Sequence, residues 1–205
     1  MQLLYILAFL SLSINNQVFL PIEVSDRKDL SKLKLSEIGN FGLLRKPRLN
    51  VLAHLHTGID IKRPNKNYSN EPIFPIAKGR IISIRNDGPY ANIIIEHEFD
   101  NLKFWSLYEH ISGIKVKVND NVNPNSAIAR FMNRDELNKN GWQFDHFHLE
   151  ILKVKPIPLK PIKGYPERFF KSFSLVCYTA DELNKYYYNP LKFFIRQRFS
   201  IVPKY

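Results

Sequence analysis

The middle of the chain alternates between short apolar runs and turn-forming residues, which is the pattern of closely spaced β-strands. Three runs rich in β-branched and aromatic residues cover residues 81–84, 91–96 and 104–108. Asn86-Asp87-Gly88-Pro89 lies between the first two and consists of residues that favour turns. Residues 114–118 alternate strictly between apolar side chains and lysines, as expected of a strand with one face in water. We therefore predict a mostly β, antiparallel fold.

The two ends of the chain depart from this pattern. Residues 1–16 are apolar and uncharged, too short to span a bilayer comfortably, and of the length of a secretory signal. We expect a signal peptide there, although the usual cation near its start is missing; a buried first element of the domain is the alternative. Residues 17–37 are expected to be a polar lead-in. Residues 154–205 begin with several prolines and end in an aromatic run, which predicts an extended connector and a segment that packs back on the domain.

Composition narrows the class of protein. A chain of 205 residues suits one domain with its own core, and 44% hydrophobic residues are typical of a globular protein. The net charge of +11 favours acidic partners, but does not choose among nucleic acid, an anionic membrane and an anionic cell wall. The single cysteine, Cys177, cannot form an intramolecular disulfide and is expected to be a small buried apolar residue.

Two short histidine stretches carry the candidate chemistry. His56 and Asp60 are four residues apart, and on a straight strand their Cα atoms would be separated by roughly 13 Å. The chain must therefore turn between them if both bind one ion, and Gly58 tolerates the backbone angles of such a turn. His146 and His148 are two residues apart, so on a strand both side chains point to one side. One of this pair would bind metal and the other would touch substrate.

Imidazole nitrogens together with one carboxylate oxygen form a ligand set that suits zinc. Three protein ligands with an open fourth position are the arrangement of catalytic zinc rather than of structural zinc. We assign His56, Asp60 and His148 as the three ligands of one Zn²⁺ ion.

The two stretches resemble the H-x-x-x-D and H-x-H motifs of the lysostaphin-type (LytM-like) zinc metallopeptidases. Further stretches resemble that family in the same order: Asn40-Phe41-Gly42 with Arg45, Pro75-Ile76-Ala77 with Gly79-Arg80-Ile81, Ile93-Ile94-Ile95-Glu96-His97, and Tyr108-Glu109-His110-Ile111. The match covers residues 38–153, which we expect to form the metallopeptidase domain. The resemblance implies a single compact antiparallel β-sheet domain with an open groove that carries the zinc site.

The same resemblance makes His110 and His146 the catalytic histidines that do not bind zinc. Neutral histidines beside a zinc-activated water can accept its proton, orient it, or serve the leaving amine. Because His110 follows Tyr108 by two residues, we expect both side chains to face the groove. We expect His54 not to be a ligand, since only His56 has an aspartate four residues later, and we expect His97 to have a hydrogen-bonded structural role.

Three further features concern the surroundings of the site. Glu150 shares a strand face with His148, so it either supports that ligand or is a charge at a strand edge. Residues 131–144 contain helix formers and an aromatic pair where relatives have a turn rich in glycine and serine, so this wall of the groove departs from the family. Residues 119–126 are rich in asparagine where relatives have glycines, and asparagine tolerates a positive φ.

These features predict an exported zinc-dependent metalloendopeptidase that hydrolyses peptide bonds in bacterial cell-wall peptidoglycan, a substrate that the resemblance implies. We expect a secreted or periplasmic location, peptidoglycan peptides as partners, no nucleic acid and no stable membrane insertion after signal removal. One alternative is a catalytically silent LytM-like protein that binds the wall or regulates a hydrolase, against which the complete ligand set argues. A second is a basic nucleic-acid-binding protein, against which both the signal and the metal motifs argue.

Overall fold

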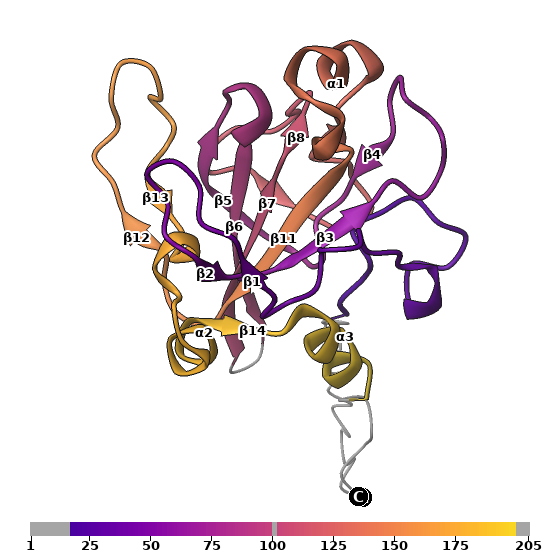
Figure 1. Cartoon of the computed structure of the whole chain (residues 1–205). Coiled ribbons are helices and arrows are strands. Elements are labelled where there is room, and N and C mark those ends of the chain that lie inside the picture. The colour runs from indigo at the N-terminus through magenta and orange to yellow at the C-terminus, as the bar shows by residue number, and fades with distance from the viewer. Residues whose placement is uncertain (1–16, 100–101, 200–205) are drawn as a thin grey trace, which may run out of the picture.

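The computed structural model describes residues 17–99 and 102–199, so the predicted signal peptide at residues 1–16 lies outside the described residues. The main sheet is antiparallel, with the strand order β14-β11-β7-β6-β5-β9, and β3 also pairs with β11 (Figure 1). Its strands are β3 (Ile59–Lys62), β5 (Gly79–Arg85), β6 (Asn92–Phe99), β7 (Leu102–Glu109), β9 (Asn121–Val122), β11 (His146–Leu152) and β14 (Tyr187–Tyr188). The prediction of a mostly β, antiparallel fold is confirmed.

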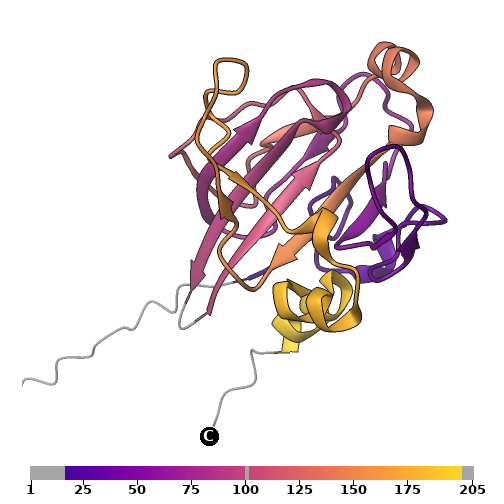
Figure 2. The same ribbon diagram turned by 60° about the vertical axis from the view of Figure 1, so that its left-hand side comes forward.

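Smaller elements surround this sheet. The short strands are β1 (Leu44–Arg45) with β2 (His54–Leu55), β4 (Pro72–Ile73) with β10 (Ala129–Phe131) and β8 (Ile111–Ser112), and β12 (Ile157–Pro158) with β13 (Phe170–Lys171). The helices are α1 (Arg134–Asn140), α2 (Ala180–Tyr186) and α3 (Pro190–Phe199), with 3-10 turns η1 (Leu30–Lys32), η2 (Gly88–Tyr90), η3 (Trp142–Phe144) and η4 (Ser174–Val176). Helix α1 lies at the opposite end of the molecule from α2 and α3 (Figures 1 and 2).

The predicted strands at residues 81–84, 91–96 and 104–108 form the centre of the sheet as β5, β6 and β7. The prediction of a strand at residues 114–118 is wrong. Its apolar side chains pack on the core and its lysines are exposed, but the backbone makes only isolated hydrogen bonds, such as Lys115 N–H to the Ile128 carbonyl. The alternation reflects side-chain burial there, because no neighbouring strand runs alongside. Asn119 does adopt a positive φ, of 75°, as expected.

The two faces of the sheet bury different cores. On β6, Ile93 and Ile95 belong to the larger cluster, whereas Ile94 points to the other face and joins a smaller one. The smaller cluster also holds Leu183 and Tyr187 from the end of the chain. The face of the sheet that carries the smaller cluster is therefore apolar where the end of the chain packs on it. The rest of that face is left for polar groups.

Segments from both ends of the chain complete the domain. Leu20 and Ile22 of the lead-in are buried in the larger core, so this segment does more than connect. The C-terminal segment packs on the sheet as predicted, with Tyr187 of β14 paired to Leu152 of β11. Cys177 is fully buried, which confirms its expected packing role. Among residues 17–99 and 102–199, no helix has both the length and the apolar character needed to cross a bilayer.

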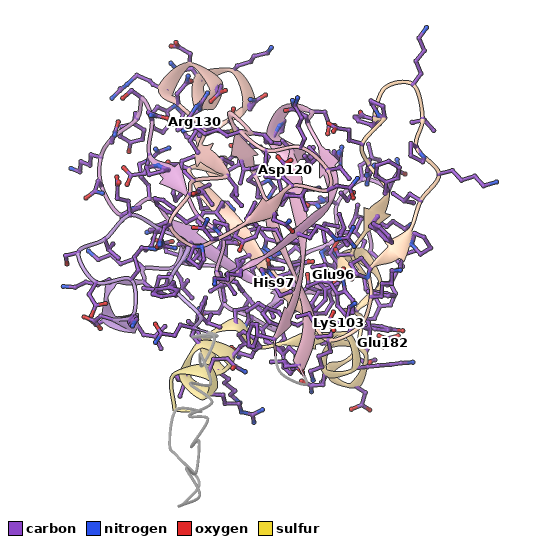
Figure 3. The ribbon with its side chains drawn as sticks, turned by 180° about the vertical axis from the view of Figure 1, so that it is seen from behind. Glu96, His97, Lys103, Asp120, Arg130 and Glu182 are labelled. Atoms are coloured by element: carbon purple, nitrogen blue, oxygen red, sulfur yellow. The ribbon has the colours of Figure 1, made fainter. Side chains whose placement is uncertain are left out.

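His97 lies within the sheet, next to the ion pair of Glu96 and Lys103, and all three are labelled in Figure 3. It is fully buried; its Nδ1–H donates to the Lys78 carbonyl (2.7 Å), and the Ser106 hydroxyl donates to its Nε2 (2.7 Å). Burial lowers the pKa of His97 to about 4, so it is neutral at pH 7. The expected structural role of His97 is confirmed.

Candidate metal centre

His56, Asp60 and His148 converge on one point. The Nε2 atom of His56 lies 3.1 Å from Oδ1 of Asp60 and 2.9 Å from Nδ1 of His148, and this Nδ1 lies 2.9 Å from Oδ1 of Asp60. The antiparallel pairing of β3 with β11 explains part of this convergence, because it sets Asp60 directly opposite His148. Opposed residues of paired strands project their side chains to the same face.

A bend brings His56 to the same point. Strand β2 ends before His56, the chain bends at Gly58, and β3 begins at Ile59, as the sequence predicts. The reason for glycine differs from the expected one, because Gly58 is not among the residues with positive φ. A Cβ atom at Gly58 would lie 2.2 Å from the Leu149 carbonyl oxygen and 2.8 Å from Cε1 of His148. Glycine is needed because the bend presses against β11.

Hydrogen bonds on the far side of each imidazole select the atom that faces the site. The Nδ1–H of His56 donates to the Asn40 carbonyl (2.9 Å), which leaves Nε2 toward Asp60. The Nε2–H of His148 donates to Oε1 of Glu150 (3.2 Å), which leaves Nδ1 toward the other two ligands. Such partners fix ring orientation and tautomer in metal sites. Glu150 is fully buried on the central strand β11, so it is the supporting group and not a strand-edge charge.

The electrostatics of the three residues favour a cation among them. Burial opposes the charge of Asp60, but hydrogen bonds from His148 and His56 outweigh it and hold the pKa of Asp60 well below its usual range. Burial likewise opposes protonation of His148, yet contacts with Asp60 and Glu150 raise its pKa to about 10. Arg45 also contacts Asp60, with Nη2 2.5 Å from Oδ2, and leaves Oδ1 to the two histidines. The pocket thus stabilises a positive charge, which a bound metal ion would supply.

The three ligand atoms fit zinc. A tetrahedral site with ligand bonds of about 2.0–2.1 Å has edges of about 3.3 Å between ligand atoms. The three distances between the facing atoms of His56, Asp60 and His148 are 2.9, 2.9 and 3.1 Å, so these atoms need to move apart only slightly to accommodate a zinc ion. Two imidazole nitrogens with one carboxylate oxygen are also a chemically suitable set.

His110 and His146 face the same groove as His56, Asp60 and His148. Their ring centroids are 5.3 Å apart, and Nε2 of His146 lies 3.8 Å from Oδ1 of Asp60. The Nδ1–H of His110 donates to the Pro89 carbonyl (2.5 Å). Burial lowers the pKa of His146 and lowers that of His110 to about 3, so both rings are neutral at pH 7.

The expectation that Tyr108 shares the groove face with His110 is wrong. Tyr108 is fully buried on the opposite face, where its hydroxyl accepts the Ile76 N–H (2.8 Å). His110 reaches the groove because it adopts a left-handed φ of 64° just beyond the end of β7. This conformation interrupts the alternation on which the expectation rested.

Glu109 is a groove residue that the sequence analysis did not single out. It is paired with His148 on one neighbouring strand and with Asn92 on the other, so all three project to the groove face. Burial raises the pKa of Glu109 to about 7. The available signal was strand alternation, because a buried Tyr108 places the next residue on the opposite face.

The groove has a volume of about 450 Å³. The groove wall that follows α1 is aromatic, with the Phe144 ring against the His110 ring at a centroid distance of 4.9 Å. We expected this wall to differ from that of the family because of the unusual sequence of residues 131–144. His54 also borders the groove, but its Nδ1 contacts the Leu52 carbonyl (2.8 Å), and it is not one of the three converging residues.

Comparison with protein families matches residues 54–161, more than half of the chain, to the family described as Peptidase family M23. No curated protein matches the sequence. Among solved structures, the chain is similar to a zinc-containing peptidase from Vibrio cholerae, with 22% identity over 66% of this chain and 37% of that one and a TM-score of 0.42. It is also similar to LytU (25% identity, 60% of this chain and 75% of that one, TM-score 0.43) and to lysostaphin (16% identity, 83% and 54%, TM-score 0.47). The chain thus spans 37% of the length of the Vibrio cholerae protein and 54% of that of lysostaphin.

Proposed function

The chain belongs to peptidase family M23, and from this we propose that it is an exported zinc metalloendopeptidase that hydrolyses peptide bonds in bacterial cell-wall peptidoglycan. Family membership confirms the resemblance that the sequence motifs indicated. The observation that carries the proposal is the convergence of His56, Asp60 and His148, with two neutral histidines facing the same groove. The excess of cations over carboxylates, a net charge of +11, suits an anionic wall.

His56, Asp60 and His148 would hold the zinc ion. When bound, zinc supplies a Lewis acid that polarises the carbonyl under attack and lowers the pKa of a water molecule to about 7. Peptide hydrolysis also needs a group that takes the proton of water and returns it to the leaving amine. His110 and His146 serve this purpose, since both are neutral at pH 7 and able to accept a proton. The Pro89 carbonyl fixes the tautomer of His110 and leaves its Nε2 for proton exchange.

Purified peptidoglycan incubated with the protein should release peptide fragments, and mass analysis of those fragments identifies the bond that is cleaved. His148→Ala should lose zinc and cleavage together because it removes a ligand. His54→Ala is the matched control, since His54 borders the same groove but is not one of the converging residues. If His54→Ala instead removes the zinc, the ligand set proposed here is incorrect.

His110→Ala and His146→Ala distinguish catalysis from metal binding. Elemental analysis after dialysis should find one zinc ion per chain in both variants, while wall cleavage falls by about 100- to 10,000-fold, the usual contribution of a positioned proton-transfer group. Unchanged cleavage in both variants would contradict these roles. If the parent protein binds the wall but cleaves neither wall nor test peptides, the catalytically silent alternative replaces this proposal.

A further inference from the structure

A second cavity, of about 560 Å³, adjoins the metal groove. Arg48, Tyr90, Glu109, Ser174 and Leu175 line both spaces, so the two are continuous. Strand β13 and turn η4 form one wall of this cavity, and both follow the last residue of the family match, residue 161. The loop between β1 and β2 contributes the facing wall, through Arg48, Leu49 and Val51. The family match therefore assigns no role to this wall.

The wall is fixed to the main sheet. The Ser83 hydroxyl oxygen on β5 accepts the N–H groups of Phe169 (3.0 Å) and Phe170 (3.1 Å). Further along, the Phe173 N–H donates to the Tyr187 hydroxyl (2.8 Å), and Tyr187 is buried against the sheet. Side chains on this segment are thus held in place relative to the metal groove, as a binding site requires.

The cavity carries cations without carboxylate partners. Arg48, Arg168 and Lys171 line it, and none of the three forms an ion pair with a carboxylate among the described residues. Arg85 also lines the cavity, but both of its contacts with Asp87, at 2.5 and 2.7 Å, neutralise its charge locally. Three cations therefore remain to attract an anion, and arginine donors match the geometry of a carboxylate.

The remaining lining defines the kind of anion. Apolar side chains such as Leu107, Phe170 and Val176 make up much of the surface, so the cavity suits an organic residue better than a free ion. Glu109 lies where the cavity meets the groove and disfavours a second negative charge at that junction. The anionic group therefore belongs farther from the metal, beside the unpaired cations.

We propose that this cavity is a subsite for a carboxylate-bearing residue of the peptide whose scissile bond lies in the metal groove. The inference rests on the proposed function, because it takes the occupant of the groove to be a wall peptide. Peptides of the wall that contain D-Glu or a diamino acid have such carboxylates. The subsite would make the protein prefer free carboxylates over carboxamides near the cleaved bond.

The test compares two synthetic wall peptides that contain D-Glu and a diamino acid, one with free carboxyl groups and one with carboxamides. Binding is measured by calorimetry on the full chain in a His146→Ala background, which suppresses turnover. The free acid should bind about tenfold more tightly, the effect of one charge-assisted hydrogen bond. Arg168→Gln and Lys171→Gln, tested separately, should each bring this ratio toward one.

Arg134→Gln is the matched control for Arg168→Gln. Each arginine lies over a tyrosine ring, Arg134 at 5.2 Å from the Tyr68 centroid and Arg168 at 6.0 Å from that of Tyr165, but Arg134 does not line the cavity. The control should keep the tenfold ratio. Equal binding of both peptides, or an unchanged ratio in Arg168→Gln and Lys171→Gln, overturns the subsite. Wall cleavage by the parent without acid preference overturns the subsite alone, whereas acid preference without any cleavage overturns the proposed function alone.

Discussion

Glu150 is the residue on which the orientation of His148 depends. Its Oε1 accepts hydrogen bonds from the Thr57 hydroxyl (2.5 Å) and from Nε2 of His148 (3.2 Å), and its side chain is fully buried. Glu150→Gln keeps the shape but removes the charge that makes the imidazole a stronger ligand. Loss of such an outer partner typically reduces metal affinity by about 10- to 100-fold, and we expect zinc affinity to fall within that range. Competition with a chromogenic chelator measures it.

Glu109→Gln is the control for this prediction. It makes the same carboxylate-to-carboxamide change on the same face of the sheet, yet the Glu109 side chain makes no hydrogen bond to His148 and has a 3.4 Å contact with Asn92 instead. Zinc affinity should therefore change much less than in Glu150→Gln. Equal losses in the two variants would show that only the total negative charge matters.

At the scale of elements, α1 is fixed through Glu136 to the small three-stranded sheet of β4, β10 and β8. This carboxylate accepts hydrogen bonds from Arg130 (2.6 and 3.0 Å), from the Ser112 hydroxyl (2.5 Å) and from the Asn133 N–H (2.7 Å). Burial alone would raise the pKa of Glu136, but these bonds outweigh burial and lower the pKa from 4.5 to about 2. Because the carboxylate is partly exposed, Glu136→Gln should reduce the free energy of unfolding at pH 7 by about 1–2 kcal/mol after solvent screening.

The pH dependence of this effect has a definite sign. Between pH 4.5 and about 2 the unfolded chain binds more protons at Glu136 than the folded chain does, so the stabilisation falls as the pH falls. The difference between the parent and Glu136→Gln should be complete above pH 4.5 and should shrink as the pH approaches 2. Urea unfolding at several pH values measures it. Glu98→Gln, at an exposed strand position, is the control and should show little difference at any pH. If the difference in the free energy of unfolding between the parent and Glu136→Gln stayed constant down to pH 2, the lowered pKa of Glu136 would not be its cause.

At the scale of the whole molecule, residues 154–199 belong to the folded unit. This segment supplies β14 to the sheet and buries Leu183, Tyr187, Phe193 and Phe194. Full burial of such a side chain is worth about 1.5–3 kcal/mol, and a domain has a total stability of about 5–15 kcal/mol. A chain that ends at Lys153 should therefore lose cooperative thermal unfolding, as measured by circular dichroism. A melting temperature within a few degrees of that of the full chain would show that residues 17–153 fold alone.

The sequence by itself predicted the central strands, the bend between His56 and Asp60, and the family to which the chain belongs. These features depend on local information. Strand alternation is periodic along the chain, and two ligands four residues apart require a turn whatever the rest of the fold does. The convergence of His148 with the first pair was implied by the resemblance to the two family motifs, and the structure brings these three side chains together.

Only the tertiary structure decided which face each side chain occupies near the ends of strands. The left-handed backbone of His110 places its side chain on a different face from the one that alternation after Tyr108 predicts, and the local pattern does not report such a change. The need for glycine at residue 58 arises from contact with β11, which lies about ninety residues away in the chain. The second cavity likewise exists because β13 and η4 pack beside the loop that carries Arg48. Contacts between distant segments leave no periodic trace in the sequence, so these properties required the folded chain.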